Sequence, residues 1–322
     1  MRALQVTELT GPDAVTVTAD APEPEPGDGL LIDVHAGGLA FADLLQTRGR
    51  YQVKPELPFT LGAEVAGTVA AAGEGSGFER GEAVMALTPG GLADRVAADA
   101  ALTFPLPESL SMDQGAGFIL NYHTAHFALH RRGGLREGET VLVHGGAGGV
   151  GTAAIQVALG AGARPIAVVS SDSKESLARE AGAREVVRSD GDWLAAVRAL
   201  TGGRGVEVVL DPVGGSRFAD SVRALAPEGR LLVVGFAAGE IPTVTANRLL
   251  LRNVSVIGVG WRGFVTDRPE LAAEIGADLR RLADGGFLRP LIGAVYPLEQ
   301  GARALRDLDE RRAAGKIVLR LR

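Results

Sequence analysis

The feature that most constrains the fold is an alternation, between residues 140 and 261, of short apolar segments with amphipathic ones. The apolar segments are rich in Val, Ile and Leu, and segments with helical spacing separate them, such as the one from Gly149 to about Gly160. Strands buried on both faces form continuous apolar runs, and parallel strands need a crossover helix between them. The alternation therefore predicts a doubly wound parallel α/β sheet. Its strands are expected at TVLVH, PIAVVS, EVVRS, VEVVLDPV, RLLVVGF and VSVIGVGW.

A second, β-rich pattern surrounds this region. The first hundred or so residues contain short strand-like segments, and the PEPEPGDG tract at 22–29 is typical of a surface turn. Residues 109–133 favour a helix that Ser111 caps and Gly133 ends. Because 322 residues exceed what one core usually supports, we expect two domains. The boundaries place a β-rich domain at 1–115, completed by 286–322, and a parallel-sheet domain at 116–285.

Composition excludes several functional classes. A net charge of −6 gives no electrostatic basis for binding nucleic acid or an anionic membrane. No run approaches the ~18 apolar residues of a membrane span, and the first residues lack an apolar signal core, so we expect a cytoplasmic protein. Cysteine is absent, which excludes disulfides, thiolate nucleophiles and thiolate zinc ligands.

A glycine-rich stretch, VLVHGGAGGVG, follows the first strand of the alternation and opens its first helix. Gly146, Gly148 and Gly151 form G-x-G-x-x-G, which brings backbone amides close to a pyrophosphate at a helix N-terminus. The alternative is a glycine-rich turn without a ligand. The residues predicted to bind the cofactor here are Gly146, Ala147, Gly148, Gly149, Val150 and Gly151.

The second strand indicates which nicotinamide cofactor binds. An NAD site places an acidic residue at the end of that strand, where this chain has Ser170 and Ser171. Asp172 follows as the expected start or cap of the next helix, and Lys174 comes two residues later. Lysine is rare here, at only three of 33 basic residues, so this one favours a 2′-phosphate and NADPH, with Arg188 assisting. The alternative is that Lys174 is a solvated helix residue.

Together these segments resemble the zinc-free quinone oxidoreductases, the zeta-crystallin type of medium-chain dehydrogenase/reductase. Other segments that carry the resemblance are GLAFADLLQTRGRY, LPFTLGAEVAGTV, NYHTAHFAL, LDPVGG, VGFAAG and GKIVL. The resemblance spans the chain. It implies a GroES-like catalytic domain, a Rossmann domain, an active site where the two meet and a homodimer. It also implies NADPH-dependent, zinc-independent reduction of quinones or other activated enones.

The resemblance also bears on metals. Zinc-dependent relatives carry cysteine ligands and a G-H-E segment, where this chain has Gly62-Ala63-Glu64. We therefore expect no metal site. Three histidines, His123, His126 and His130, share one helical face, but amphipathic packing explains that spacing equally well. His144 is expected to be structural.

The resemblance implies particular site residues. Tyr51 matches the family's active-site tyrosine and is the predicted catalytic group, although it could equally shape the pocket without chemistry. Ala40 replaces the family's asparagine, and Asp43 is expected to cap the helix that follows it. Further cofactor contacts are expected from residues on the NYHTA segment and at later strand ends, namely Thr124, Val213, Gly235, Phe236, Val259 and Gly260.

Two rival functions stay open. One is an enoyl-CoA or other enoyl-thioester reductase on the same scaffold, which Ala40 favours because it widens and depolarises the pocket. The other is a non-catalytic, crystallin-like NADPH-binding protein. Turnover with a quinone would exclude the non-catalytic protein. Comparing the rates with quinones, enones and enoyl-CoAs would distinguish an enoyl-thioester reductase from a quinone reductase.

Overall fold

The chain divides into two compact units. The computed structural model describes residues 1–322, with the exception of the Thr266 side chain. The first unit contains Met1–Leu120, Pro269–Asp284 and Arg289–Arg322, and the second contains Asn121–Arg268 and Gly285–Leu288. None of the helices in the described part of the chain has the length and apolarity needed to cross a membrane.

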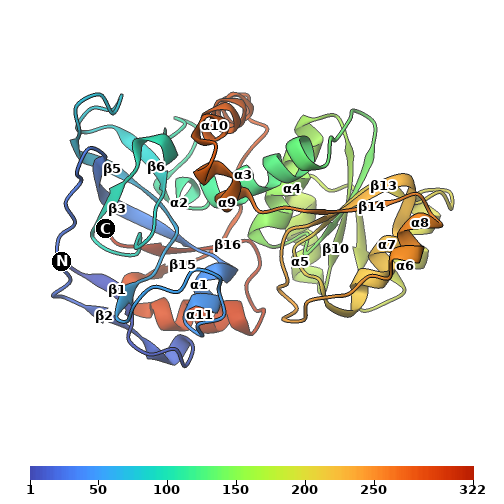
Figure 1. Cartoon of the computed structure of the whole chain (residues 1–322), viewed down its shortest axis with the longest axis horizontal. Coiled ribbons are helices and arrows are strands. Elements are labelled where there is room, and N and C mark those ends of the chain that lie inside the picture. Colours follow the sequence, from blue (N-terminus) through green and yellow to red (C-terminus); the bar gives the residue numbers. More distant parts are fainter. The chain divides into compact units, whose positions relative to one another are not determined.

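The second unit is built on a six-stranded sheet whose strands all run parallel, in the order β11-β10-β9-β12-β13-β14 (Figure 1). This order reverses beside β9, as in the doubly wound dinucleotide-binding fold. The predicted α/β fold with a parallel sheet is confirmed. The strands are β9 (Thr140–His144), β10 (Arg164–Val169), β11 (Glu185–Arg188), β12 (Val206–Asp211), β13 (Leu225–Val233) and β14 (Ser255–Gly258).

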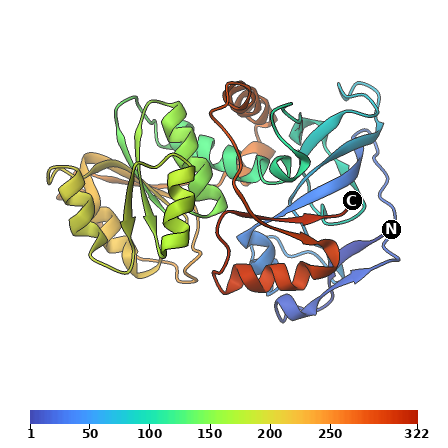
Figure 2. The ribbon, with the colours of Figure 1, turned by 180° about the vertical axis from the view of Figure 1, so that it is seen from behind.

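Helices pack against this sheet, and the first of them follows the glycine-rich stretch (Figure 2). It spans the predicted residues, Gly149–Gly160, and eight of its residues are buried. The sequence SRFADSVRALAP at 216–227 also favours a helix, but the helix ends at Ala224, because Pro227 cannot continue it and the chain enters β13. The helices are α4 (Gly149–Gly160), α5 (Asp172–Glu180), α6 (Trp193–Leu200), α7 (Phe218–Ala224), α8 (Ala246–Leu250) and α9 (Trp261–Thr266).

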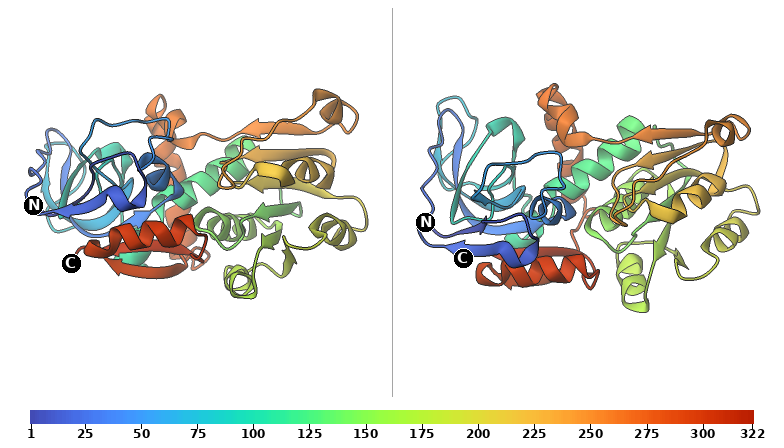
Figure 3. Two further views of the ribbon diagram at one scale, coloured as in Figure 1. Left: turned by 90° about the horizontal axis from the view of Figure 1, so that it is seen from below. Right: turned by 60° about the horizontal axis from the view of Figure 1, so that its bottom comes forward.

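The first unit contains two sheets around one core (Figure 3). A three-stranded sheet has the order β2-β1-β4, and a seven-stranded sheet has the order β15-β16-β3-β5-β6-β8, with β7 paired to β3. The strands are β1 (Ala3–Val6), β2 (Val15–Thr18), β3 (Leu30–Leu39), β4 (Phe59–Thr60), β5 (Glu64–Ala72), β6 (Ala83–Leu87), β7 (Arg95–Ala98), β8 (Thr103–Pro105), β15 (Ile292–Pro297) and β16 (Lys316–Arg320).

The helices of the first unit are α1 (Phe41–Gln46), α2 (Met112–Gly115), α10 (Pro269–Asp284) and α11 (Gly301–Asp309). The predicted parallel-sheet domain includes residues 269–284, whereas α10 belongs to the first unit. Gly276 permits this, because a Cβ at that position would lie 2.3 Å from the Phe104 ring.

The long helix predicted over 109–133 is interrupted. Ser111 does cap α2, with its Oγ accepting from Gln114 N–H, and Gly133 does end the helical segment. Between them the chain leaves the helix at Gly115, resumes as α3 (Ile119–His126) and continues as a π-helix over Phe127–Arg132. Two glycines at 115 and 117 weaken the helix at the interruption.

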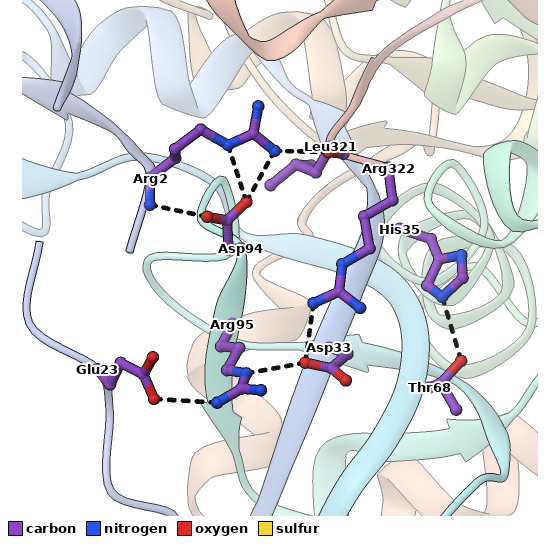
Figure 4. Close-up of polar contacts among 9 residues, drawn as sticks. All are labelled: Arg2, Glu23, Asp33, His35, Thr68, Asp94, Arg95, Leu321 and Arg322. Atoms are coloured by element: carbon purple, nitrogen blue, oxygen red, sulfur yellow. Dashed lines mark hydrogen bonds and ion pairs between the residues drawn. The ribbon is translucent and has the colours of Figure 1, made fainter. Parts of the chain in front are cut away.

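An ion-pair network joins the two ends of the chain within the first unit (Figure 4). The Arg2 guanidinium donates to Asp94 Oδ1 at 2.9 Å and to the Leu321 carbonyl at 2.7 Å. Asp33 accepts from both Arg95 (2.9 Å) and Arg322 (3.0 Å). These side chains remain partly exposed, so each pair contributes little to stability alone.

Candidate active site

The glycine turn between β9 and α4 is packed so closely that side chains would not fit. A Cβ at Gly151 would lie 2.1 Å from the Gly145 carbonyl oxygen, and one at Gly146 would lie 2.8 Å from Ala167 Cβ. Gly145 itself has a φ of +62°, a conformation that favours glycine. Sequence reasoning did not include Gly145 among the site residues. The Gly-Gly doublet at 145–146 was the sequence signal that could have identified it as part of the turn.

The turn leaves the N-terminus of α4 open. Its N-cap is Gly148, which has no side chain to accept from the first helical N–H groups. Those groups, on Gly149, Val150 and Gly151, have no intrahelical acceptor. Together with the helix dipole they form a site suited to a phosphate group. The six residues predicted to bind the pyrophosphate all lie here, and the cradle fits that group.

The four residues predicted to hold the 2′-phosphate lie together at the carboxyl ends of β10 and β11. Ser171 is the N-cap of α5, and its Oγ accepts from Lys174 N–H at 3.3 Å. Lys174 Nζ donates to Ser170 Oγ at 3.4 Å. Asp172 is the first residue of α5, as expected. Hydroxyl groups and an ammonium group therefore converge where an NAD site would have a carboxylate.

Arg188 completes this group from the end of β11. Its guanidinium donates to the Ser170 carbonyl at 3.3 Å and pairs with both Asp172 and Asp190. Burial of part of the side chain would lower the pKa of Arg188, but the two carboxylates outweigh it and raise that pKa. Asp172 and Asp190 are largely exposed, so an incoming phosphate can compete with them for this arginine.

Loops after three further strands carry the contacts expected nearer the nicotinamide. Val213 lies beside the glycine turn, since a Cβ at Gly145 would be 3.3 Å from Val213 Cγ2. Phe236 packs close to Gly214 in the same way, at 3.0 Å. Gly235 N–H donates to the Asp211 carbonyl at 3.4 Å, and Val259 N–H donates to the Val233 carbonyl at 3.0 Å. Gly260 is the N-cap of α9.

Helix α3 carries the remaining predicted cofactor residue, Thr124, which is partly buried. The helix is fixed to α4 by Tyr122, whose hydroxyl donates to Gln156 Oε1 at 2.8 Å. Burial raises the pKa of the Tyr122 phenol, so it stays protonated. Asn121 of α3 lies against the glycine turn, where a Cβ at Gly149 would be 2.7 Å from its side-chain nitrogen.

The predicted catalytic residue Tyr51 belongs to the first unit, in the segment after α1, and is partly exposed. Ala40 is the N-cap residue of α1, and Asp43 Oδ2 accepts from Ala40 N–H at 2.7 Å. The expected capping role of Asp43 is confirmed. Burial raises the pKa of this carboxyl to about 6, against the opposing effects of that hydrogen bond and of the Lys316 charge.

A buried ion pair beside Asp43 was missed by sequence reasoning. Lys316 Nζ donates to Glu64 Oε1, and the two side chains are 4% and 1% exposed. The other carboxylate oxygen of Glu64 accepts from Leu120 N–H at 3.0 Å, near the start of α3. Gly38 and Gly117 leave room for the Lys316 chain, because a Cβ at these positions would lie 2.7 and 3.0 Å from it. These glycines were the only local signal, because the paired residues are 252 positions apart.

A zinc ion does not fit the residues present. The chain has no cysteine, and Ala63 stands at the position of the histidine in the G-H-E segment of zinc-dependent relatives. Among the side chains that the structure describes, no three His, Cys, Asp or Glu residues form a group able to hold a metal ion. Of the three helical histidines, His123 contacts Trp261 (ring centroids 5.0 Å apart) and His126 contacts His130 (4.4 Å).

Comparisons with known proteins agree with this geometry. Residues 26–108 match the family model described as alcohol dehydrogenase GroES-like domain, which bears out the predicted GroES-like domain. Residues 149–277 match the model described as zinc-binding dehydrogenase.

Full-length relatives are also similar. Rat quinone oxidoreductase-like protein 2 is 38% identical over 325 residues, covering 100% of this chain and 92% of the relative. Rat quinone oxidoreductase is 33% identical over 327 residues, covering 100% and 98%. A mycobacterial protein solved as a complex with NADPH has 35% identity and a TM-score of 0.92, with 100% of both chains covered.

Proposed function

Because the chain belongs to the quinone oxidoreductase family of medium-chain dehydrogenases/reductases and is an oxidoreductase of that family, we propose that it reduces quinones or other activated enones with NADPH. The observation that carries the choice of cofactor is the convergence of Ser170, Ser171, Lys174 and Arg188 after the second strand of the sheet. The similar mycobacterial protein solved with NADPH supports the same choice.

The cofactor would lie along the carboxyl ends of the parallel strands of the second unit, which contains Asn121–Arg268 of the predicted binding domain. The open N-terminus of α4 binds the pyrophosphate through backbone amides. Lys174 and Arg188 bind the 2′-phosphate as two cations, and the two serine hydroxyls add hydrogen bonds. The residues proposed to line the nicotinamide half are Thr124, Val213, Gly235, Phe236, Val259 and Gly260.

When bound, NADPH supplies a hydride, which leaves one proton to be delivered to the substrate oxygen. We assign that role to Tyr51, whose phenol donates a hydrogen bond to the developing oxyanion and can pass its proton on to it. Asp43 does not take this role, because it is buried and bonded to Ala40 N–H. The metal-free residue set means that polarisation of the carbonyl depends on such donors alone.

The direct test follows NADPH oxidation against 1,4-benzoquinone, an enone, an aldehyde and an enoyl-CoA, with NADH alongside. We expect turnover with the quinone and the enone and a preference for NADPH. Fast turnover with the enoyl-CoA alone would favour an enoyl-thioester reductase. NADPH binding without turnover on any acceptor would favour the non-catalytic alternative.

Two variants test the residue assignments. Lys174→Ala should raise the KM for NADPH by about 10-fold and leave that for NADH unchanged, whereas Arg184→Ala, which removes an exposed cation next to β11, should change neither.

Tyr51→Phe should lower kcat by about 10-fold or more. Its matched control is Tyr296→Phe, since that hydroxyl donates to Asp307 at 2.5 Å in the first unit. Equal kcat values for both tyrosine variants would remove Tyr51 from the mechanism.

We further propose that the protein is a homodimer that pairs through β14. This strand lies at the edge of the six-stranded sheet and bonds to β13 on one side only (Figure 3). In the segment that joins β13 to β14, the apolar side chains of Ile241, Leu250 and Leu251 are more than 70% exposed. An edge strand with apolar neighbours pairs readily with a second copy about a two-fold axis. Light scattering should give a dimer for the protein and for Leu200→Asp, and a monomer for the Leu250→Asp/Leu251→Asp variant.

A further inference from the structure

Three buried polar side chains lie next to the loops that form the proposed cofactor site. His144 is the last residue of β9, Asp211 is the last residue of β12, and Ser221 belongs to α7. Each is at most 1% exposed. Because β9 and β12 are parallel neighbours with Leu210 opposite Val143, His144 and Asp211 occupy adjacent positions at the carboxyl edge of the sheet.

Asp211 fixes the loop that follows its own strand. Its Oδ1 accepts from Val213 N–H at 2.8 Å and from Gly214 N–H at 2.9 Å. Its backbone carbonyl accepts from Val234 N–H at 3.0 Å, which ties in the loop after β13. One aspartate therefore sets the course of both loops beside the glycine turn.

His144 is held from the other side by Ser221. Its Nε2 lies 2.8 Å from Ser221 Oγ, and that hydroxyl donates to the Arg217 carbonyl at 3.1 Å. The Ser221 hydroxyl has a single proton, which it donates to the Arg217 carbonyl. The hydrogen bond between Ser221 and His144 must therefore use the imidazole proton, so Nε2 is protonated and donates to Ser221 Oγ. The imidazole also packs edge-on against Trp193, with ring centroids 4.9 Å apart.

Two buried acceptors are then left over. His144 Nδ1 and Asp211 Oδ2 have no hydrogen-bond partner among the residues that the structure describes. Burial lowers the pKa of His144 to about 4, the Asp211 charge opposes that effect and the Arg217 charge adds to it. The imidazole is therefore neutral at neutral pH, and neither atom can donate to the other.

We propose that His144, Asp211 and Ser221 form a buried triad, in which Asp211 is the positioning residue that holds the Val213 loop against the glycine turn. In this triad Asp211 sets the affinity for the nicotinamide cofactor through the backbone of Val213 and Gly214, without touching the cofactor. The identity of that cofactor rests on the proposed function. The role of Asp211 requires its accepting oxygen and not its charge, because both contacts of Oδ1 are to backbone N–H groups.

The experiment compares Asp211→Asn with Asp211→Ala in the full-length protein, by titration with NADPH and by thermal unfolding. The asparagine keeps the accepting oxygen for Val213 and Gly214 and replaces the unpaired, buried carboxylate oxygen with an amide nitrogen. We expect its Kd for NADPH to stay within about 2-fold of the wild type and its Tm to be equal or higher. The alanine variant should raise the Kd about 10-fold and the KM for NADPH with it, while kcat for the quinone stays nearly unchanged.

Equal Kd values for the two variants, or loss of binding and of Tm in Asp211→Asn, would overturn the proposal. If Asp211→Ala does not fold, the asparagine variant alone decides between these outcomes. If the wild-type protein binds no NADPH, the proposed function fails, and the order of Tm values still tests the triad. Nitrogen-15 NMR of the five histidines gives an independent check, since His144 Nδ1 should be unprotonated in the wild type and Nε2 protonated.

Discussion

Helix α4 in the second unit and helix α1 in the first begin in opposite ways. In the second unit, α4 begins at Gly148 and has no side-chain cap. In the first unit, the Asp43 carboxylate accepts from Ala40 N–H at the start of α1, and the Glu64 carboxylate accepts from Leu120 N–H near the start of α3. A helix N-terminus attracts negative charge in each case. The difference is whether that charge comes from the chain itself or is left to a ligand.

The comparison explains why we propose the glycine turn, and not the charged cluster, as the anion site. Glu64 and Asp43 already occupy the N-terminal positions in the first unit, and Lys316 neutralises Glu64 within the protein. The turn before α4 brings backbone close to the helix and contributes no charge of its own. The glycine turn therefore depends on the absence of side chains, whereas the charged cluster depends on the buried side chains of Asp43, Glu64 and Lys316.

The largest expected effect comes from breaking the charged cluster. Lys316→Met leaves the Glu64 carboxylate buried without its partner, which should lower the free energy of unfolding by about 3–5 kcal/mol. The double variant Glu64→Gln/Lys316→Met should recover most of this loss, because neither side chain is then charged. Urea unfolding measures all three proteins. Equal stability of the single and double variants would mean that the pair is not what stabilises this region.

The next effect comes from the glycine turn. Gly151→Ala forces a methyl group to within 2.1 Å of a carbonyl oxygen that cannot move without shifting the turn. We expect the free energy of unfolding to fall by about 3 kcal/mol and the Kd for NADPH to rise at least about 10-fold. The matched control is Gly148→Ala, whose methyl group would meet its nearest neighbour at an ordinary 3.4 Å. Similar losses in both variants would contradict the steric explanation.

A smaller effect concerns the pH dependence of Asp43. Its carboxyl has a pKa of about 6 in the folded protein because of burial, against about 4 in an unfolded chain. Between these values the folded state binds more protons, so stability falls as the pH rises from about 4 to 6. Asp43→Asn still accepts from Ala40 N–H and should raise stability at pH 7 by about 2 kcal/mol. Unfolding measured at pH 4 and 7 should show the gain only at the higher pH.

Sequence reasoning succeeded where the constraint is local. The strand before the glycines and the helix after them identified the turn, and Ser171 and Lys174 lie three residues apart on one helix start. It failed for Glu64 with Lys316, and for His144 with Asp211, because strand pairing across long separations brings them together. Helix α10 was missed although Pro269 at its start and apolar residues at 271, 272, 275 and 279 gave a local signal.

The smallest effect comes from a carboxylate that stays near the surface and so reverses the sign of the pH dependence. Burial would raise the pKa of Asp94, but hydrogen bonds from the Arg2 side chain and backbone outweigh it and lower that pKa (Figure 4). A lowered pKa contributes stability that is fully present above about pH 4 and is lost as the pH falls below that value, through the lower pKa of the folded state. The Asp94 and Arg2 side chains are 23% and 41% exposed, so Asp94→Asn should cost less than about 1 kcal/mol at pH 7.

Acid unfolding of this variant beside Asp43→Asn checks the comparison. Asp94→Asn should flatten the dependence of stability on pH below pH 4, and Asp43→Asn should flatten it between pH 4 and 6. If both substitutions changed the pH dependence of stability in the same direction, burial would not explain the difference between the pKa values of Asp43 and Asp94.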